Sequence, residues 1–426
     1  MRISVGIDRL LGYIGQTCIC CVLLADLIIF PFCFHREFLS KQLLKPDCPS
    51  LMLPRTICMM VCIAVSLWVA ATYDRIRIVY LAAYGFVCMS VYFLVDYSSA
   101  IPIVIWLTFF LCSQLDSTGR KRILLLLASI LALHCIFGIY VYLFSPTDFV
   151  TPGFGRRAGG IFGNPNILYP MAIIAICLFS MMERYCSSVK RLICITAAAL
   201  SLLVTIFTFG RGAWLGVASV FLSNRFVSGR GRTIQVVLGA ALIVGCIFVR
   251  TGGQLMGTTT DKSASGRLLI WRDAEDQISL APVFGGGYQT YFRSTHRAIP
   301  LPFLHQHWIP EEPKNLYLNI LLDFGVFGFL ILIIWIGATM YGCYCTLRSE
   351  RDILDTIIAQ STVLTTIAYL VSGFFDTPIF GPVGRESSTL CYIVLMGLAV
   401  AAESERCSPN KSKNRIGATH AKIKLC

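Results

Sequence analysis

The residues that could do chemistry lie in four polar segments between long apolar runs. In the first segment, residues 151–166, Arg156 and Arg157 stand among five glycines, and the segment ends in Asn164-Pro-Asn166. Glycine lets backbone N–H groups approach a ligand closely, and the start of a helix favours an anion. The segment therefore predicts an anion-binding loop, with a simple turn between two helices as the alternative.

The second and third segments each contribute an arginine. Arg211 stands between glycines in residues 208–216, close to membrane depth, where a guanidinium is costly unless it is paired. Arg267 begins an amphipathic stretch to Leu280 and shares a helix face with Trp271, four residues on. A planar guanidinium fits a phosphate well. The alternatives are a structural brace or headgroup contact for Arg211 and a solvated surface helix for Arg267.

The fourth segment, residues 305–319, gathers groups that can move a proton. A histidine, a glutamate or a lysine of lowered pKa could take a proton from an attacking hydroxyl. The spacing is not that of a helical zinc motif, so we expect no metal here. A solvated loop rim without chemistry is the alternative. The candidate residues are His305, His307, Glu311, Glu312 and Lys314.

The composition indicates a membrane protein with several spans. Of 426 residues, 56% are hydrophobic and 14% are charged, which excludes an ordinary soluble enzyme. The net charge of +13 has no nucleic-acid motif beside it, so we expect contact with membrane lipids and not with nucleic acid. Most of the 19 cysteines lie in apolar runs and behave as buried hydrophobic residues.

The apolar runs predict an all-α integral membrane protein with about twelve transmembrane helices. The predicted spans are 10–34, 54–73, 76–95, 99–116, 123–144, 166–182, 192–209, 212–224, 233–249, 316–346, 353–371 and 388–402. No clear cleavage site follows the first run, which we read as a span and not as a signal peptide. This gives helices 1–9 within residues 1–249, a loop with amphipathic helices at 250–315, helices 10–12 within 316–402, and a basic tail at 403–426.

Lysine and arginine gather in alternate short loops and in the tail, although the 35–50 loop breaks this pattern. By the positive-inside rule, both termini are cytoplasmic and the long loop between helices 9 and 10 faces outward.

Taken in order, the motifs resemble the bacterial O-antigen ligase/polymerase family of lipid-linked polysaccharide glycosyltransferases. The resemblance runs from about residue 120 to 400. It rests on Gly159-Gly-Ile-Phe-Gly-Asn-Pro-Asn166, Gly210-Arg-Gly-Ala-Trp214, Ser265-Gly-Arg267 with Trp271, Pro282 with Gly285 and Gly287, and Asn315-Leu-Tyr-Leu318 through Gly325 and Gly328.

The resemblance implies a multi-pass protein of the bacterial inner membrane with a periplasmic site beneath the long loop. The donor would be a glycan on undecaprenyl diphosphate, without a cofactor, and Arg211 and Arg267 would hold the diphosphate. The expected catalytic residues also include Lys314, His305 and His307. Expected contacts to substrate come from Arg156, Arg157, Asn164, Asn166, Trp271 and Asn315.

One departure concerns the acceptor and its base. Ligases of the family usually have a histidine where this chain has Lys314, which favours a polymerase without deciding the matter. The base could then be His305, His307, Glu311 or Glu312. A ligase would use lipid A–core as acceptor, and a polymerase would use a second lipid-linked glycan. A lipid transporter or flippase is the alternative from another class, and it would expose its site to both sides of the membrane.

Overall fold

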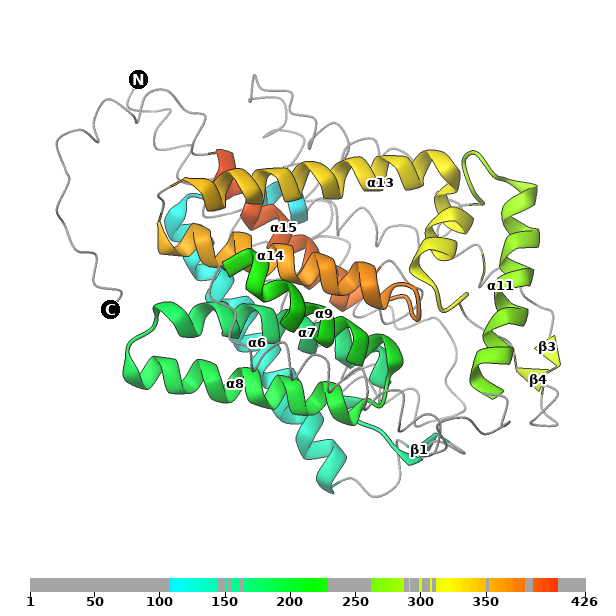
Figure 1. Ribbon diagram of the computed structural model, residues 1–426, viewed down its shortest axis with the longest axis horizontal. Helices are drawn as coiled ribbons and strands as arrows, with labels where there is room; N and C mark the ends of the chain where they lie inside the picture. Colours follow the sequence, from blue (N-terminus) through cyan, green and yellow to red (C-terminus); the bar gives the residue numbers. More distant parts are fainter. Residues whose placement is uncertain are drawn as a thin grey trace, which may run out of the picture.

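The computed structural model describes residues 108–144, 150–151, 155–160, 164–228, 262–286, 291, 299–300, 307–308, 312–349, 352–379 and 386–404. These residues form a helical protein (Figure 1). The helices are α6 (Ser117–Phe144), α7 (Pro165–Met182), the 3-10 turn η4 (Glu183–Tyr185), α8 (Ser188–Phe207), α9 (Arg211–Ser228), α11 (Lys262–Leu280), α13 (Leu316–Arg348), α14 (Ile353–Ser372) and α15 (Glu386–Ser404).

Two short antiparallel strand pairs add to the predicted all-α architecture. Val150–Thr151 (β1) pairs with Gly155–Arg156 (β2), and Ile299–Pro300 (β3) pairs with His307–Trp308 (β4). Each pair is only two residues long and closes a loop, so the fold remains helical.

Five helices in the described part of the chain are long and apolar enough to cross a membrane: α6, α7 with η4, α8, α13 and α14. They match the predicted spans 123–144, 166–182, 192–209, 316–346 and 353–371. The shorter apolar helix Ser388–Glu403 matches 388–402, and α9 covers 212–224. The predicted spans 10–34, 54–73, 76–95 and 233–249 lie outside the described residues, as does most of 99–116. The chain is a membrane protein.

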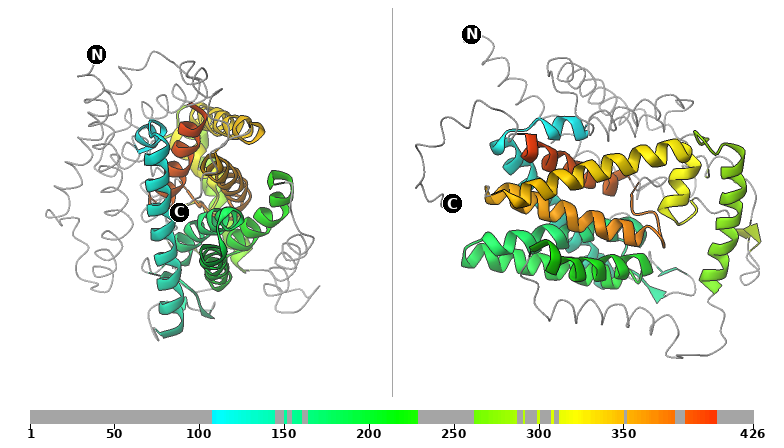
Figure 2. Two further views of the ribbon diagram at one scale, coloured as in Figure 1. Left: turned by 90° about the vertical axis from the view of Figure 1, so that its left-hand side faces the viewer. Right: turned by 45° about the horizontal axis from the view of Figure 1, so that its top comes forward.

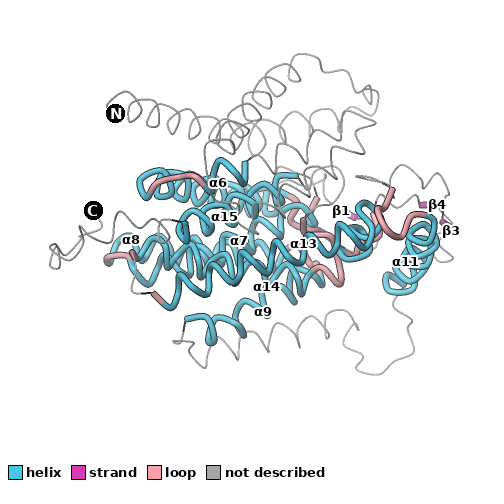
Figure 3. Tube along the Cα trace, turned by 90° about the horizontal axis from the view of Figure 1, so that it is seen from above, coloured by secondary structure: helices cyan, strands magenta, loops and turns pink. Residues whose placement is uncertain are grey.

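Helix α7 forms the centre of the bundle. It contacts α6, α8, α9, α14 and α15, and nearly all of its side chains are buried. Pro165 occupies its first turn, where the missing N–H costs nothing, and the Asn164 side chain accepts from the Asn166 N–H at 2.9 Å. A helix that is apolar all round is stable only inside a bundle, which explains this position. Figure 2 shows the helices packed side by side, and Figure 3 places α7 near the middle of them.

The peripheral helices expose large apolar side chains. Leu133 and Ile136 on α6, Leu192 on α8, and Leu330 and Ile334 on α13 are all exposed. In water such a surface would be unfavourable, but in a bilayer it contacts lipid chains without penalty. The exposed surface thus agrees with the membrane assignment.

Helix α13 is not the uninterrupted span predicted at 316–346, because it breaks at Gly325, where φ is 64° and ψ is −171°. The loop after α11 fills the break: the Gly286 N–H donates to the Leu322 carbonyl at 2.8 Å, and the Val326 N–H donates to the Pro282 carbonyl at 2.9 Å. The backbone groups freed by the break are therefore satisfied by another segment. As a result, α11 stands across the end of the bundle (Figures 1 and 3).

A buried ion pair ties the first turns of α6 and α14 together. Arg120 is 1% exposed and donates to Asp355 at 3.0 Å and to the Leu115 carbonyl at 3.1 Å. We expect Asp355→Ala to destabilise the protein by about 3–5 kcal/mol, because it leaves a buried guanidinium without its counter-charge. Thermal unfolding in detergent would measure this.

A surface pair provides the control for this prediction. Arg191 donates to Glu183 at 2.8 Å, and its side chain is 51% exposed. We expect Glu183→Ala to cost less than about 1 kcal/mol. Equal melting temperatures for the Asp355 and Glu183 variants would contradict the assignment of Arg120–Asp355 as a structural ion pair.

Candidate functional site

The turn that follows α14, residues 373–377, joins α11 and the start of α13 through three successive backbone carbonyls. The Gly373 oxygen accepts from the Leu316 N–H at 2.8 Å, and the Phe374 oxygen accepts from the Asn315 side chain at 3.4 Å. The Phe375 oxygen accepts from the Arg267 guanidinium. This turn, called here the carbonyl turn, fixes segments that are far apart in the sequence.

Helix α11 presents Arg267 and Trp271 on one face, as the spacing of four residues predicts. Arg267 reaches the carbonyl turn, and the Trp271 indole N–H donates to the Pro313 carbonyl at 3.0 Å. Pro313 lies two residues before Asn315, and Phe375 follows Phe374, whose carbonyl accepts from the Asn315 side chain. The position of Arg267 is therefore set from both sides, by α14 and by the segment before α13.

Arg211, the first residue of α9, lies beside the same turn. Its neighbour Gly212 is packed so tightly that a Cβ there would lie 3.3 Å from the Ser372 carbonyl oxygen and 3.5 Å from the Asp376 Cβ. The close approach of α9 to α14 depends on this glycine. The start of α9 and the tip of Arg267 thus meet the same turn, although 55 residues separate the two arginines.

Arg157 connects the first polar segment to this region. Its Nε donates to the Thr208 carbonyl at 2.6 Å, and its Nη2 donates to the Asn166 side chain at 3.4 Å. Thr208 lies three residues before Arg211, at the end of α8, and Asn166 lies in the first turn of α7. Arg156 lies in β2, and its side chain is outside the described residues.

The expected base region contains an ion pair between Lys314 and Glu312. Glu312 is 2% exposed, whereas the Lys314 side chain is 18% exposed. Lys314 has a φ of 52°, a left-handed conformation that few non-glycine residues adopt. Asn315 then caps α13, accepting from the Tyr317 N–H at 2.9 Å and the Leu318 N–H at 3.2 Å. The side chains of His305, His307 and Glu311 are outside the described residues.

Three helices begin in this region: α7 at Asn164, α9 at Arg211 and α13 at Asn315. The start of a helix carries partial positive charge and N–H groups without partners in the helix. Together with the guanidinium groups of Arg157, Arg211 and Arg267, these helix starts give the region an electropositive character that suits an anion.

Comparison with known families agrees with this geometry. Residues 196–333 match the family model described as O-antigen ligase. This segment of the chain is similar to the O-antigen ligase family. The matched residues include Arg211, Arg267, Trp271, Lys314 and Asn315, and the match supports glycan transfer of the ligase or polymerase kind. No curated protein matches the chain.

The carbonyl turn lies outside the matched residues, and sequence reasoning missed it. Asp376 of this turn is buried, and its side chain accepts from the Thr377 N–H at 2.9 Å. A carboxylate within the apolar sequence Phe374-Phe375-Asp376-Thr377-Pro378 was the available signal, because a charge between two spans is costly and marks a functional position by default.

Tyr291 also lies within the matched residues, close to Asp273 of α11. Burial and the nearby Asp273 carboxylate raise the pKa of Tyr291, so its hydroxyl stays protonated at neutral pH. Tyr291 packs with Ile270, Ala274 and Leu322, and therefore helps to hold α11 against α13. Within the described ranges, no group of three His, Cys, Asp or Glu side chains could hold a metal ion.

Proposed function

We propose that this protein transfers a glycan from undecaprenyl diphosphate to an acceptor hydroxyl on the periplasmic side of the bacterial inner membrane. The observation that carries the proposal is the meeting of Arg267 and the start of α9 at the carbonyl turn. In this reaction the acceptor oxygen attacks the anomeric carbon, and the bond from that carbon to the phosphate oxygen breaks. The lipid diphosphate leaves with the electron pair.

The arginines have a clear task in this chemistry. Negative charge grows on the leaving diphosphate, and guanidinium groups that are already in place stabilise it without reorganisation. Arg211 and Arg267 are assigned this role, and Arg156 is proposed to contact the donor. The hydrogen bonds of Arg157, Asn164, Asn166, Trp271 and Asn315 suit residues that shape the donor site and hold it in position.

The proton of the acceptor hydroxyl must pass to a base. The Lys314–Glu312 pair flanks Pro313, whose carbonyl accepts from Trp271 of α11, so we assign this pair as the candidate base in the described part of the chain. His305 and His307 remain candidates in the same loop. The proposed enzyme needs no cofactor or metal, since the arginines stabilise the negative charge that develops on the departing diphosphate.

A reconstituted assay tests the proposal. Purified protein in proteoliposomes would receive undecaprenyl-diphosphate glycan and, in separate reactions, lipid A–core or a second lipid-linked glycan. We expect product with one of the two acceptors, and this outcome separates a ligase from a polymerase. Arg211→Ala is expected to lower the rate by about 10²-fold or more, while Arg191→Ala, an exposed arginine on α8, keeps the wild-type rate.

Two results would overturn the proposal, and a third would support a different function. No product from the wild type with either acceptor would overturn the proposal, as would full activity in Arg211→Ala. Movement of labelled lipid across the bilayer, without transfer, would instead support a transporter.

A further inference from the structure

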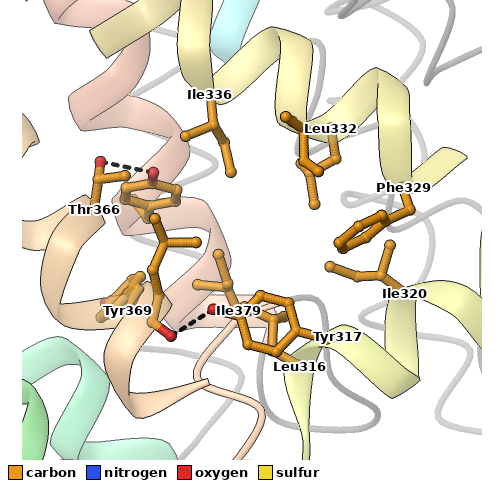
Figure 4. A pocket seen from close by; sticks show the side chains of 12 residues that line it. Leu316, Tyr317, Ile320, Phe329, Leu332, Ile336, Thr366, Tyr369 and Ile379 are labelled. Atoms are coloured by element: carbon orange, nitrogen blue, oxygen red, sulfur yellow. Dashed lines mark hydrogen bonds between the residues drawn. The ribbon is translucent and has the colours of Figure 1, made fainter. Parts of the chain in front are cut away.

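An apolar cavity of about 210 Å³ is lined by residues on both sides of the carbonyl turn in the sequence, Leu370 before it and Ile379 after it. Helices α13, α14 and α15 form its walls, together with Ile379 of the segment that follows the turn. Figure 4 shows the break in α13 as its origin: Ile320 lies before the break, and Leu332 and Ile336 lie after it, on the opposite side of the open space. A straight α13 could not line two sides of one cavity.

One end of the cavity adjoins the candidate site. Leu316 and Tyr317 line it, and they follow Asn315 directly. The Leu316 N–H binds the Gly373 carbonyl, and the Tyr317 hydroxyl donates to the Leu370 carbonyl at 2.6 Å. Arg267 is bound two carbonyls further along the same turn. A guanidinium therefore lies near the end of an apolar space.

The cavity also reaches the outer surface of the bundle. Ile333, one of its lining residues, is 50% exposed, and Leu370 is exposed as well. Exposed apolar side chains on membrane helices face lipid. A chain in the bilayer could thus enter from the side of α13.

The hydroxyl groups in the lining are already engaged. Thr366 and Tyr392 form a hydrogen bond at 2.9 Å, and the Tyr369 hydroxyl donates to the Pro170 carbonyl at 2.8 Å. With Tyr317 bound to Leu370, the lining presents hydrocarbon and ring surface. Such a cavity favours an apolar chain over a sugar or water.

We infer that this cavity binds the first isoprene units of the donor's prenyl chain, while the diphosphate lies at Arg211 and Arg267. The inference rests on the proposed function and deepens it, since it names the part of the donor that the α13–α14 space recognises. A prenyl diphosphate has an anionic head joined to an apolar chain. The surfaces here follow the same order, because the guanidinium matches the anionic head, and the cavity and the surrounding lipid match the apolar chain.

Two isoleucines of α13 give a matched test. Ile333 lines the cavity and Ile334 does not, yet each is 50% exposed. Ile333→Trp would fill the space with an indole ring, and Ile334→Trp would place the same ring toward lipid. Binding of undecaprenyl diphosphate and of a diphosphate with only two isoprene units would be measured for each variant in nanodiscs by native mass spectrometry. Transfer kinetics would be measured in parallel with glycan donors of both chain lengths.

We expect Ile333→Trp to weaken binding of the long-chain diphosphate and to raise the donor KM by about tenfold or more, because each displaced CH₂ group loses its burial. The short-chain compound and kcat change little, and Ile334→Trp matches the wild type. Equal effects of the two variants would overturn the inference, as would an equal loss for both chain lengths, or a change in the KM of the acceptor alone. Binding that follows this pattern without any transfer would support the cavity and overturn the proposed function.

Discussion

Arg267→Ala is expected to lower kcat/KM for glycan transfer by about 10²- to 10³-fold, with expression and melting temperature close to wild type. The guanidinium is held by the Phe375 carbonyl, so it is positioned before the donor binds and needs no reorganisation during the reaction. Its loss removes a positive charge from the point where charge develops on the leaving diphosphate. Transfer rates at several donor concentrations would measure the effect.

The conservative variant makes this prediction specific. Arg267→Lys keeps the charge, but a single ammonium group is a compact point charge that lacks the planar fork with several fixed donors. It cannot hold the Phe375 carbonyl and a phosphate in the same way, and we expect most activity to be lost. Arg272→Ala, an exposed arginine on the same helix, is the control and should retain activity. Full activity in the lysine variant would show that the charge alone suffices.

Gly325→Ala is expected to destabilise the protein and to abolish most transfer. The backbone at Gly325 has a φ of 64° and a ψ of −171°, a region open essentially to glycine alone and costing roughly 1–3 kcal/mol for other residues. A Cβ there would also overlap the Val283 carbonyl and lie 2.6 Å from the Gly285 nitrogen. Because both neighbours are backbone, they cannot rotate away, and α11 would move with Arg267.

Gly337 on the same helix provides the control, because a Cβ at that position would have no neighbour within 4 Å. We expect Gly337→Ala to melt at or above the wild-type temperature, and Gly325→Ala to melt several degrees lower. Transfer assays on both variants would show whether the activity of Gly325→Ala falls further than its folded fraction. A Gly325 variant that behaves like the Gly337 variant would contradict the role of the loop in positioning α11.

Within the described residues, hydropathy predicted five helices that are long and apolar enough to span a membrane, because such helices must be about twenty apolar residues long. The starts of α7 and α13 were visible at Asn164 and Asn315, since asparagine before an apolar run caps a helix. The break at Gly325 was not predicted, because a lone glycine in an apolar run is also compatible with a continuous helix. The break is stabilised by Pro282 and Gly286, which lie some 40 residues away and supply the backbone hydrogen-bond partners that the broken helix lacks.

The candidate site was likewise predictable only in part. Arg211 and Arg267 stood out because arginine between apolar runs is rare and costly. That Arg267 and the start of α9 meet at residues 373–377 could not be predicted, since no local pattern links α9, α11 and α14. Asp376 was missed although a carboxylate in an apolar stretch was a visible signal, and its burial beside Gly212 is what the sequence could not show.

The carbonyl turn joins its three partners through main-chain oxygens, so these contacts do not depend on which side chains occupy Phe374 and Phe375. Substitution at these two positions can therefore accumulate over evolution while the assembly stays intact. A one-residue insertion or deletion between Gly373 and Asp376 has the opposite effect, because it shifts the order of the oxygens and separates α11 and α13 from α14 at once. The turn is thus tolerant of changes in composition and intolerant of changes in length.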